Sequence, residues 1–196
     1  MTGYRSKKIA YDMAFGEIEE LFEEIPSFIE LICKKGGDAC IELTQTRFKR
    51  CYVCLKACKI ALKYSLPLLF VDACHIKNDY NGVILGACSI DGNGQLVPIA
   101  FAIADIEDNN NWNWFMDNLK KSNNIIIGKK MSFISDQEKG IIKATADVFP
   151  GCQQCFCVKH IEKNVKNKLN GRQVVPEMWA AAKIIKFLKK IWKKYQ

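Results

Sequence analysis

The chain has 196 residues, 49% hydrophobic and 26% charged, a composition that fits one or two globular domains and excludes extensive disorder. No apolar run could cross a bilayer, and residues 1–9 are basic and polar without an apolar stretch behind them, so we expect neither a membrane anchor nor a secretion signal. Residues 1–158 (18 Lys and Arg against 19 Asp and Glu) carry a net charge of −1 and residues 159–196 (11 against 2) a net charge of +9, which favours an anionic partner such as nucleic acid, or else a lysine-rich solvated helix face.

The first third of the chain predicts helices. Residues 15–33 have apolar positions at helical spacing with glutamates mostly opposite, and Pro26 bends or restarts this helix. Gly36-Gly37 ends it, a short strand over 39–43 follows, and residues 48–64 look like a second helix. We therefore interpret residues 1–65 as a helical lead-in segment and residues 66–196 as the main domain.

The centre of the chain predicts strands. Residues 68–71 form a continuous apolar run, which is typical of a strand buried on both faces. Residues 82–90 and 96–104 form two further strands, and Asp91-Gly92-Asn93-Gly94 between them is a strong hairpin signal.

Helices and strands alternate after this hairpin. The expected elements are a helix over 110–122, a strand over 131–134, a helix over 138–149, a strand over 154–158, a helix from residue 160 and a last helix from Pro176. Strands reached through helical crossovers should run parallel to their neighbours. The fold class is therefore α/β, a mixed five-stranded sheet with helices on both faces.

Two carboxylates stand at the carboxyl ends of predicted strands, where sites gather in such sheets. Asp72 closes the first apolar strand, and Asp136 closes the fourth. Each residue alone is explained by a helix N-cap or a loop, and Ser135 is an alternative cap beside Asp136. On neighbouring strands, however, the two acids repel each other unless a divalent cation lies between them, and Mg²⁺ prefers such oxygen ligands. We therefore expect a two-metal phosphoryl-transfer site.

The ten cysteines are expected as thiols or metal ligands rather than disulfides. Cys152, Cys155, Cys157 and His160 are the ligand types of a zinc site, but their spacing is too tight for the usual zinc knuckle or finger. We rank a structural or substrate-orienting role for Cys157 and His160 above zinc binding. Cys51, Cys54 and Cys58 have helical spacing, and we interpret them as small buried thiols.

The stretch from about Phe48 to Trp192 resembles Mutator-like (MULE) transposases, most specifically between Leu68 and Asn164. The segments that carry the resemblance, in chain order, are 69–77, 82–94, 97–108, 111–115, 133–140, 148–150 and 157–164. No single segment is specific, and the resemblance depends on their shared order and spacing.

The resemblance implies an RNase H-like catalytic domain of the DDE type. Asp72 and Asp136 would hold two Mg²⁺ or Mn²⁺ ions, and His75, Cys157 and His160 fall on the family's histidine and CxxH positions. The implied reaction is cleavage of DNA at element ends, followed by attack of the freed 3′-hydroxyl on target DNA. DNA partners, a nuclear location and a homo-oligomer are expectations of the same kind.

The third acid of a DDE site is expected on the helix after the CxxH motif. The aligned stretch falls near Lys186-Phe187, and no Asp or Glu occurs between residues 178 and 196. Glu177 is the candidate in the neighbourhood. An acid in the first turn of a helix is equally explained by the helix dipole, so both interpretations stay open.

Lysines of the carboxyl-terminal segment recur at helical spacing. They are Lys183, Lys186, Lys190 and Lys193. We expect them to bind DNA in a salt-sensitive manner from a helix that packs its apolar side on the sheet, although such a helix also suits membranes or partner proteins.

Three functional hypotheses follow from the sequence. The first is a DDE-type transposase domain, as a fragment or a decayed copy of an element's enzyme. The second is a domesticated, non-catalytic derivative kept for DNA binding or scaffolding. The third is an interaction module stabilised by zinc at the cysteines.

Overall fold

The computed structural model describes residues 6, 9, 18–45, 47–77, 81–123, 131–169, 176, 179–181 and 183. The chain divides into two compact units, residues 1–155 and residues 156–196. The first unit contains almost the whole sheet and the helices packed on it. The expectations for Glu177, Lys186, Lys190 and Lys193 fall outside the described residues.

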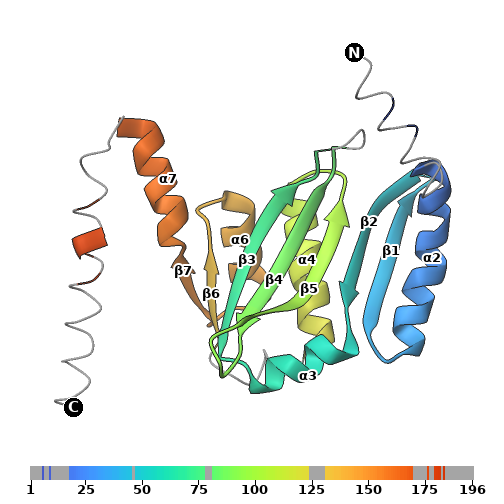
Figure 1. The fold of residues 1–196 in the computed structure, drawn as a ribbon, viewed down its shortest axis with the longest axis horizontal. Helices are drawn as coiled ribbons and strands as arrows, with labels where there is room; N and C mark the ends of the chain where they lie inside the picture. The colour runs from blue at the N-terminus through green and yellow to red at the C-terminus, as the bar shows by residue number, and fades with distance from the viewer. Residues whose placement is uncertain are drawn as a thin grey trace. The chain divides into compact units, whose positions relative to one another are not determined.

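Within the described ranges, seven strands form one sheet. They are β1 (Asp38–Thr44), β2 (Arg47–Cys54), β3 (Leu68–His75), β4 (Val83–Ile90), β5 (Leu96–Ala104), β6 (Ser132–Ser135) and β7 (Gln153–Phe156). Their order in the sheet is β1-β2-β5-β4-β3-β6-β7 (Figure 1). The pairs β1–β2, β2–β5, β5–β4 and β4–β3 are antiparallel, and β3–β6 is parallel. The expected mixed α/β sheet is confirmed, with two strands more than the five expected.

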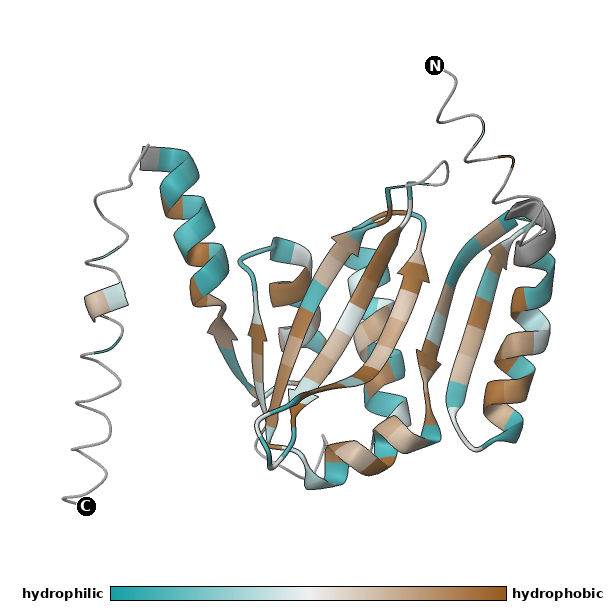
Figure 2. Ribbon diagram, viewed as in Figure 1, coloured by the Kyte–Doolittle hydropathy of each residue, from teal (hydrophilic) through white to brown (hydrophobic). Residues whose placement is uncertain are grey.

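Helices of the first unit cover both faces of the sheet. They are α2 (Ile18–Lys34), α3 (Lys56–Tyr64), α4 (Asn109–Ser122) and α6 (Lys139–Val148). The second unit contains α7 (Val158–Leu169). The apolar stripes of α4 and α6 share a buried core with β3, β4 and β5, whereas α2 packs on the opposite face of β1 and β2. Figure 2 shows how apolar the central strands are. None of the described helices is long and apolar enough to span a membrane.

The helix expected over 48–64 is wrong in its first half, because residues 47–54 form β2. Alternation along this strand sends Tyr52 and Cys54 into the core under α4, and Cys51 and Val53 into the core under α2. A strand buried on both faces lacks a polar side, so its pattern resembles that of a buried helix. The lead-in segment is therefore not wholly helical, and it contributes β1 and β2 to the sheet. The boundary between residues 65 and 66 stays a prediction.

The hairpin between β4 and β5 is confirmed. The Asp91 side chain accepts hydrogen bonds from the backbone N–H groups of Asn93 (2.9 Å) and Gln95 (2.8 Å). Gly94 has a φ of +80°, a conformation that glycine adopts without strain. This local turn fixes the register of the two central strands.

Leu85 on β4 is completely buried, whereas Leu96 on β5 is 64% exposed. We expect Leu85→Ala to lower the free energy of unfolding by about 2–5 kcal/mol, because it removes buried methyl groups and leaves a cavity. Leu96→Ala, the matched control on the same hairpin, should change it by at most about 0.5 kcal/mol. Urea denaturation measures both, and equal losses would contradict this assignment of the core.

Candidate active site at the carboxyl edge of the sheet

Three strands of the sheet point their carboxyl ends to one edge. Strand β4 is antiparallel to both β3 and β5, so β3 and β5 run in the same direction, and β6 is parallel to β3. Four acids and one histidine lie in the last residues of these strands or in the segments that follow them: Asp72, Glu107, Asp136, Glu138 and His75. We call these five residues the acidic edge.

Asp72 lies on β3, and Asp136 directly follows β6, the neighbouring strand. The parallel pairing joins Leu68 to Ser132 and ends with Phe70 opposite Ile134. Continued by two residues, the same register places Asp72 opposite Asp136, and paired strands lie about 4.8 Å apart. Side chains alternate between the two faces along β3. Val71 is buried in the core under α4 and α6, and Asp72 is exposed, so Asp72 lies on the opposite face of the sheet. A shared cation stays a prediction.

Asp72 does not close its strand, which corrects the sequence interpretation. Strand β3 continues to His75 because β4 pairs with it throughout, with Gly86 opposite Asp72 and Val83 opposite His75. Asp72 therefore caps no helix. A Cβ atom built at Gly86 would meet only the Asp72 carbonyl oxygen, at 3.9 Å, so the first unit leaves room beside this carboxylate.

The N-cap of α6 is Glu138, so neither Ser135 nor Asp136 has that role. The Glu138 side chain accepts from the Ile141 N–H at 3.0 Å. One carboxylate oxygen of Asp136 accepts from the Glu138 backbone N–H at 3.0 Å. The ordinary capping explanation for Asp136 is thereby removed, and its carboxylate is fixed just before the helix begins.

Glu107 is the acid that the sequence reasoning missed. It follows β5, its side chain is 20% exposed, and it accepts a hydrogen bond from the Trp112 indole N–H at 3.2 Å. The imidazole Nε2 of His75 lies 3.6 Å from its Oε2. The sequence does contain one sign of this acid, because three acids follow β5 in the run Asp105-Ile106-Glu107-Asp108. The run does not tell which of the three acids turns toward the acidic edge.

Burial is the largest influence on the Glu107 carboxyl and raises its pKa. The hydrogen bond from Trp112 lowers this pKa, the charge of Glu138 raises it, His75 lowers it and Asp136 raises it. Glu107 is thus electrostatically coupled to the residues that follow β6. A sheet edge that gathers carboxylates in this way favours cations.

Among the described residues, no group of three or more His, Cys, Asp and Glu side chains is arranged to hold a metal ion, at the cysteines or at the acidic edge. Zinc at the cysteines and a divalent cation at the acidic edge both stay predictions. Cys51 and Cys54 are buried thiols, but they lie on β2 and not on the expected helix face, and Cys58 is half-buried on α3. Burial raises the pKa of the Cys51 and Cys54 thiols, which opposes the thiolate that zinc requires. Mg²⁺ fits the carboxylates better, because it keeps several waters and needs few protein oxygens.

The second unit contains the CxxH motif. Cys157 directly precedes α7, and its carbonyl oxygen accepts from the Ile161 N–H at 3.0 Å. His160 lies in the first turn of α7, as expected from the sequence. Lys183 is exposed. The expected position of Cys157 and His160 beside the sheet stays a prediction.

The mixed sheet with helices on both faces defines an α/β domain of the RNase H-like class. Residues 68–164 match the family model of the MULE transposase domain, and the chain therefore contains a domain of this family. The match begins at the first residue of β3 and ends within α7, so it includes the whole acidic edge but neither β1 nor β2. No curated protein matches the chain.

A pH-dependent stability is expected from Glu107. The Glu107 carboxyl holds its proton more tightly in the folded state than in the unfolded chain, where its pKa is roughly 4.3. Its contribution to the free energy of unfolding is therefore fully present below that pH. It is lost as pH rises through the higher folded pKa. Glu107→Gln, which retains an acceptor for Trp112, should therefore gain stability relative to the parent protein between pH 4 and pH 7.

Urea denaturation at several pH values measures this difference. Glu24→Gln on the exposed surface of α2 is the matched control, and it should show no comparable trend. A Glu107→Gln difference that is constant with pH would contradict the burial of this carboxyl.

Proposed function

We propose that this chain is the DNA strand-cleavage and strand-transfer domain of a MULE-type transposase, working by DDE-type two-metal phosphoryl transfer. The observation that supports the proposal is the parallel pairing of β3 with β6, because its register, continued by two residues, would bring Asp72 opposite Asp136 inside the segment that matches the family. Carboxylates on two parallel strands suit a divalent cation that neither could hold alone.

Each residue of the acidic edge has a distinct task in this proposal. Asp72 and Asp136 hold the cations, Mg²⁺ or Mn²⁺, which when bound would activate the attacking oxygen and stabilise the leaving oxygen. Asp136 is oriented by its hydrogen bond from the Glu138 backbone. Glu107 adds negative charge and holds His75, an exposed group that can meet a substrate phosphate. The amino-terminal ends of α4 and α6 lie at the same edge and partly balance the negative charge.

Glu177 is our proposed third acid, and Cys157 and His160 are proposed to orient substrate or stabilise the fold. DNA is the proposed partner, in the nucleus, with Lys183, Lys186, Lys190 and Lys193 contacting phosphates and with a second copy of the chain as a further partner. Zinc at Cys152, Cys155, Cys157 and His160 is the weaker proposal.

A second function is favoured by one observation. No Asp or Glu occurs between residues 178 and 196, and the family's acid aligns near Lys186. A lysine facing the cations would oppose their binding. A domesticated, non-catalytic DNA-binding or scaffolding protein is therefore the alternative, and Mg²⁺-dependent strand cleavage that is abolished by Glu177→Gln would exclude it.

The first test of the proposal is cation affinity. Asp72→Asn and Asp136→Asn should each weaken Mn²⁺ binding at least about tenfold, and the double variant should add little because both carboxylates serve one site. Titration calorimetry of the full chain measures this affinity. Asp117→Asn, on the exposed surface of α4, is the control that should bind Mn²⁺ like the parent protein.

Unchanged Mn²⁺ affinity in both Asp variants would contradict the proposed site. The same variants are then tested on DNA with free ends in Mn²⁺ buffer, where a nicking activity that survives both substitutions would contradict the proposed chemistry.

DNA binding by the carboxyl-terminal lysines is tested by its salt dependence. Each lysine that contacts a phosphate contributes about one unit to the slope of the logarithm of affinity against the logarithm of salt concentration. Replacing Lys183, Lys186, Lys190 and Lys193 together by Gln should therefore flatten that slope by several units. A matched set at Lys34, Lys56, Lys63 and Lys139 controls for net charge. Equal slopes for the two sets would show that the terminal lysines have no special role.

A further inference from the structure

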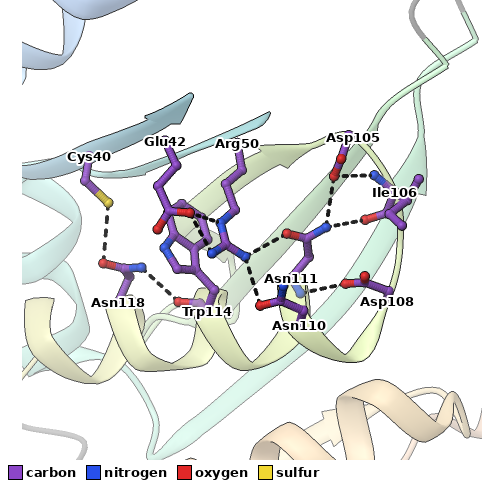
Figure 3. Close-up of polar contacts among 10 residues, drawn as sticks. All are labelled: Cys40, Glu42, Arg50, Asp105, Ile106, Asp108, Asn110, Asn111, Trp114 and Asn118. Atoms are coloured by element: carbon purple, nitrogen blue, oxygen red, sulfur yellow. Dashed lines mark hydrogen bonds and ion pairs between the residues drawn. The ribbon is translucent and has the colours of Figure 1, made fainter. Parts of the chain in front are cut away.

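The turn that carries Glu107 to the acidic edge is held by one buried side chain. The amide nitrogen of Asn111 donates to Asp105 Oδ1 at 3.1 Å and to the carbonyl oxygen of Ile106 at 2.9 Å (Figure 3). The Asn111 backbone N–H donates to the Asp108 side chain at 2.7 Å. Glu107 therefore lies between residues that Asn111 fixes on both sides.

Asn111 is in turn held by Arg50 on β2. Arg50 is 6% exposed, and its Nη1 donates to Asn111 Oδ1 at 2.9 Å. On its other side the guanidinium binds Glu42 on β1 through Nε (2.7 Å) and Nη2 (2.6 Å). Its central carbon lies 4.5 Å from the ring centroid of Trp114, which fixes the guanidinium plane (Figure 3).

This contact decides which way the Asn111 amide is turned. An arginine offers donors alone, so the amide oxygen must face Arg50 and the amide NH₂ must face the turn. The flipped amide would place its oxygen against the carboxylate of Asp105 and lose both bonds to the turn. Arg50 thereby sets the hydrogen bonds that hold residues 105 and 106.

An apolar residue at position 50 would pack the sheet against α4 without the desolvation penalty of a buried charge. Burying the Arg50 charge has a desolvation penalty, which its partner Glu42, 40% exposed, offsets only in part, and replacing such a charge by packed apolar groups is often neutral or stabilising. What arginine adds is direction, because its planar fork fixes the orientation of each partner. The network is thus better suited to positioning than to adding stability.

We propose that Arg50, which lies outside the segment matched by the family, is a positioning residue for the acidic edge and acts through Asn111 on the turn that carries Glu107. The effect on cation binding rests on the proposed function, whereas the coupling between Arg50 and Glu107 does not. The proposal makes β1 and β2 part of the working domain.

The test combines Mn²⁺ affinity with a double-mutant cycle in the full chain. Arg50→Met should weaken Mn²⁺ binding about five- to tenfold, Glu107→Gln should do the same, and the double variant should be no weaker than either single variant. Asn111→Asp keeps an acceptor for Arg50 but loses both donors to the turn, so it should match Arg50→Met. The control is Lys59→Met, which removes the 2.6 Å ion pair between Lys59 on α3 and Asp38 on β1. This variant should change the Mn²⁺ affinity less than twofold.

A second readout is independent of metal. The Trp112 indole N–H and the ring of His75, one of two histidines in the chain, both contact Glu107, and proton NMR can follow the signals of both groups. Arg50→Met and Asn111→Asp should shift both signals, and Lys59→Met should leave them in place. Unshifted signals would overturn the positioning role. It would also be overturned if the loss of Mn²⁺ affinity in Arg50→Met added fully to the loss in Glu107→Gln. Shifted signals with Mn²⁺ affinity unchanged in Asp72→Asn and Asp136→Asn would support the positioning role while contradicting the proposed function.

Discussion

The parallel pairing of β3 with β6 is the interaction on which the candidate site depends. Three successive pairs, from Leu68 opposite Ser132 to Phe70 opposite Ile134, fix the register of the two strands. A shift by one residue would turn every side chain of one strand to the other face and separate Asp72 from Asp136. The buried residues Leu69 and Phe133, which face the core between them, oppose such a shift. The same hydrophobic burial that stabilises the sheet therefore sets the relative position of the two carboxylates.

Gathering acids at one edge has an electrostatic cost, and the structure reduces it in several ways. Helices α4 and α6 both begin there and turn their positive ends toward the acids. Trp112 and His75 contact Glu107, and the Glu138 carboxylate is engaged as a helix cap. Asp72 is instead exposed on the other face of the sheet. In the proposed function, a divalent cation between Asp72 and Asp136 offsets the remaining repulsion between the carboxylates.

The sequence was most informative where structure is decided locally. The turn at Asp91–Gly94 revealed the hairpin, and the apolar stripe of Trp112, Phe115, Met116 and Leu119 marked α4, whose four side chains are all completely buried. Asp72 and Asp136 could be singled out because each follows an apolar run. These signals lie within a few residues of the feature that they predict.

The rest depends on contacts between residues far apart in the chain. Strand β2 pairs with β5, about fifty residues later, and nothing local distinguishes its two-sided burial from that of a helix. Arg50 and Asn111 are 61 positions apart, so neither residue predicts the other. Glu107 stands among three acids in a row of four residues, and only the packing of Trp112 and His75 shows which of them turns inward.

The most direct measurement is a crystal structure of the full chain grown with Mn²⁺, with the metal located by its anomalous scattering. We expect Mn²⁺ at roughly 2.0–2.2 Å from a carboxylate oxygen of both Asp72 and Asp136, as hard cations of this size bind. Carboxylates of Asp72 and Asp136 more than about 10 Å apart would contradict it, because paired ions in two-metal sites lie only about 3.5–4 Å from each other. Mn²⁺ bound elsewhere, with both aspartates free of metal, would contradict it equally.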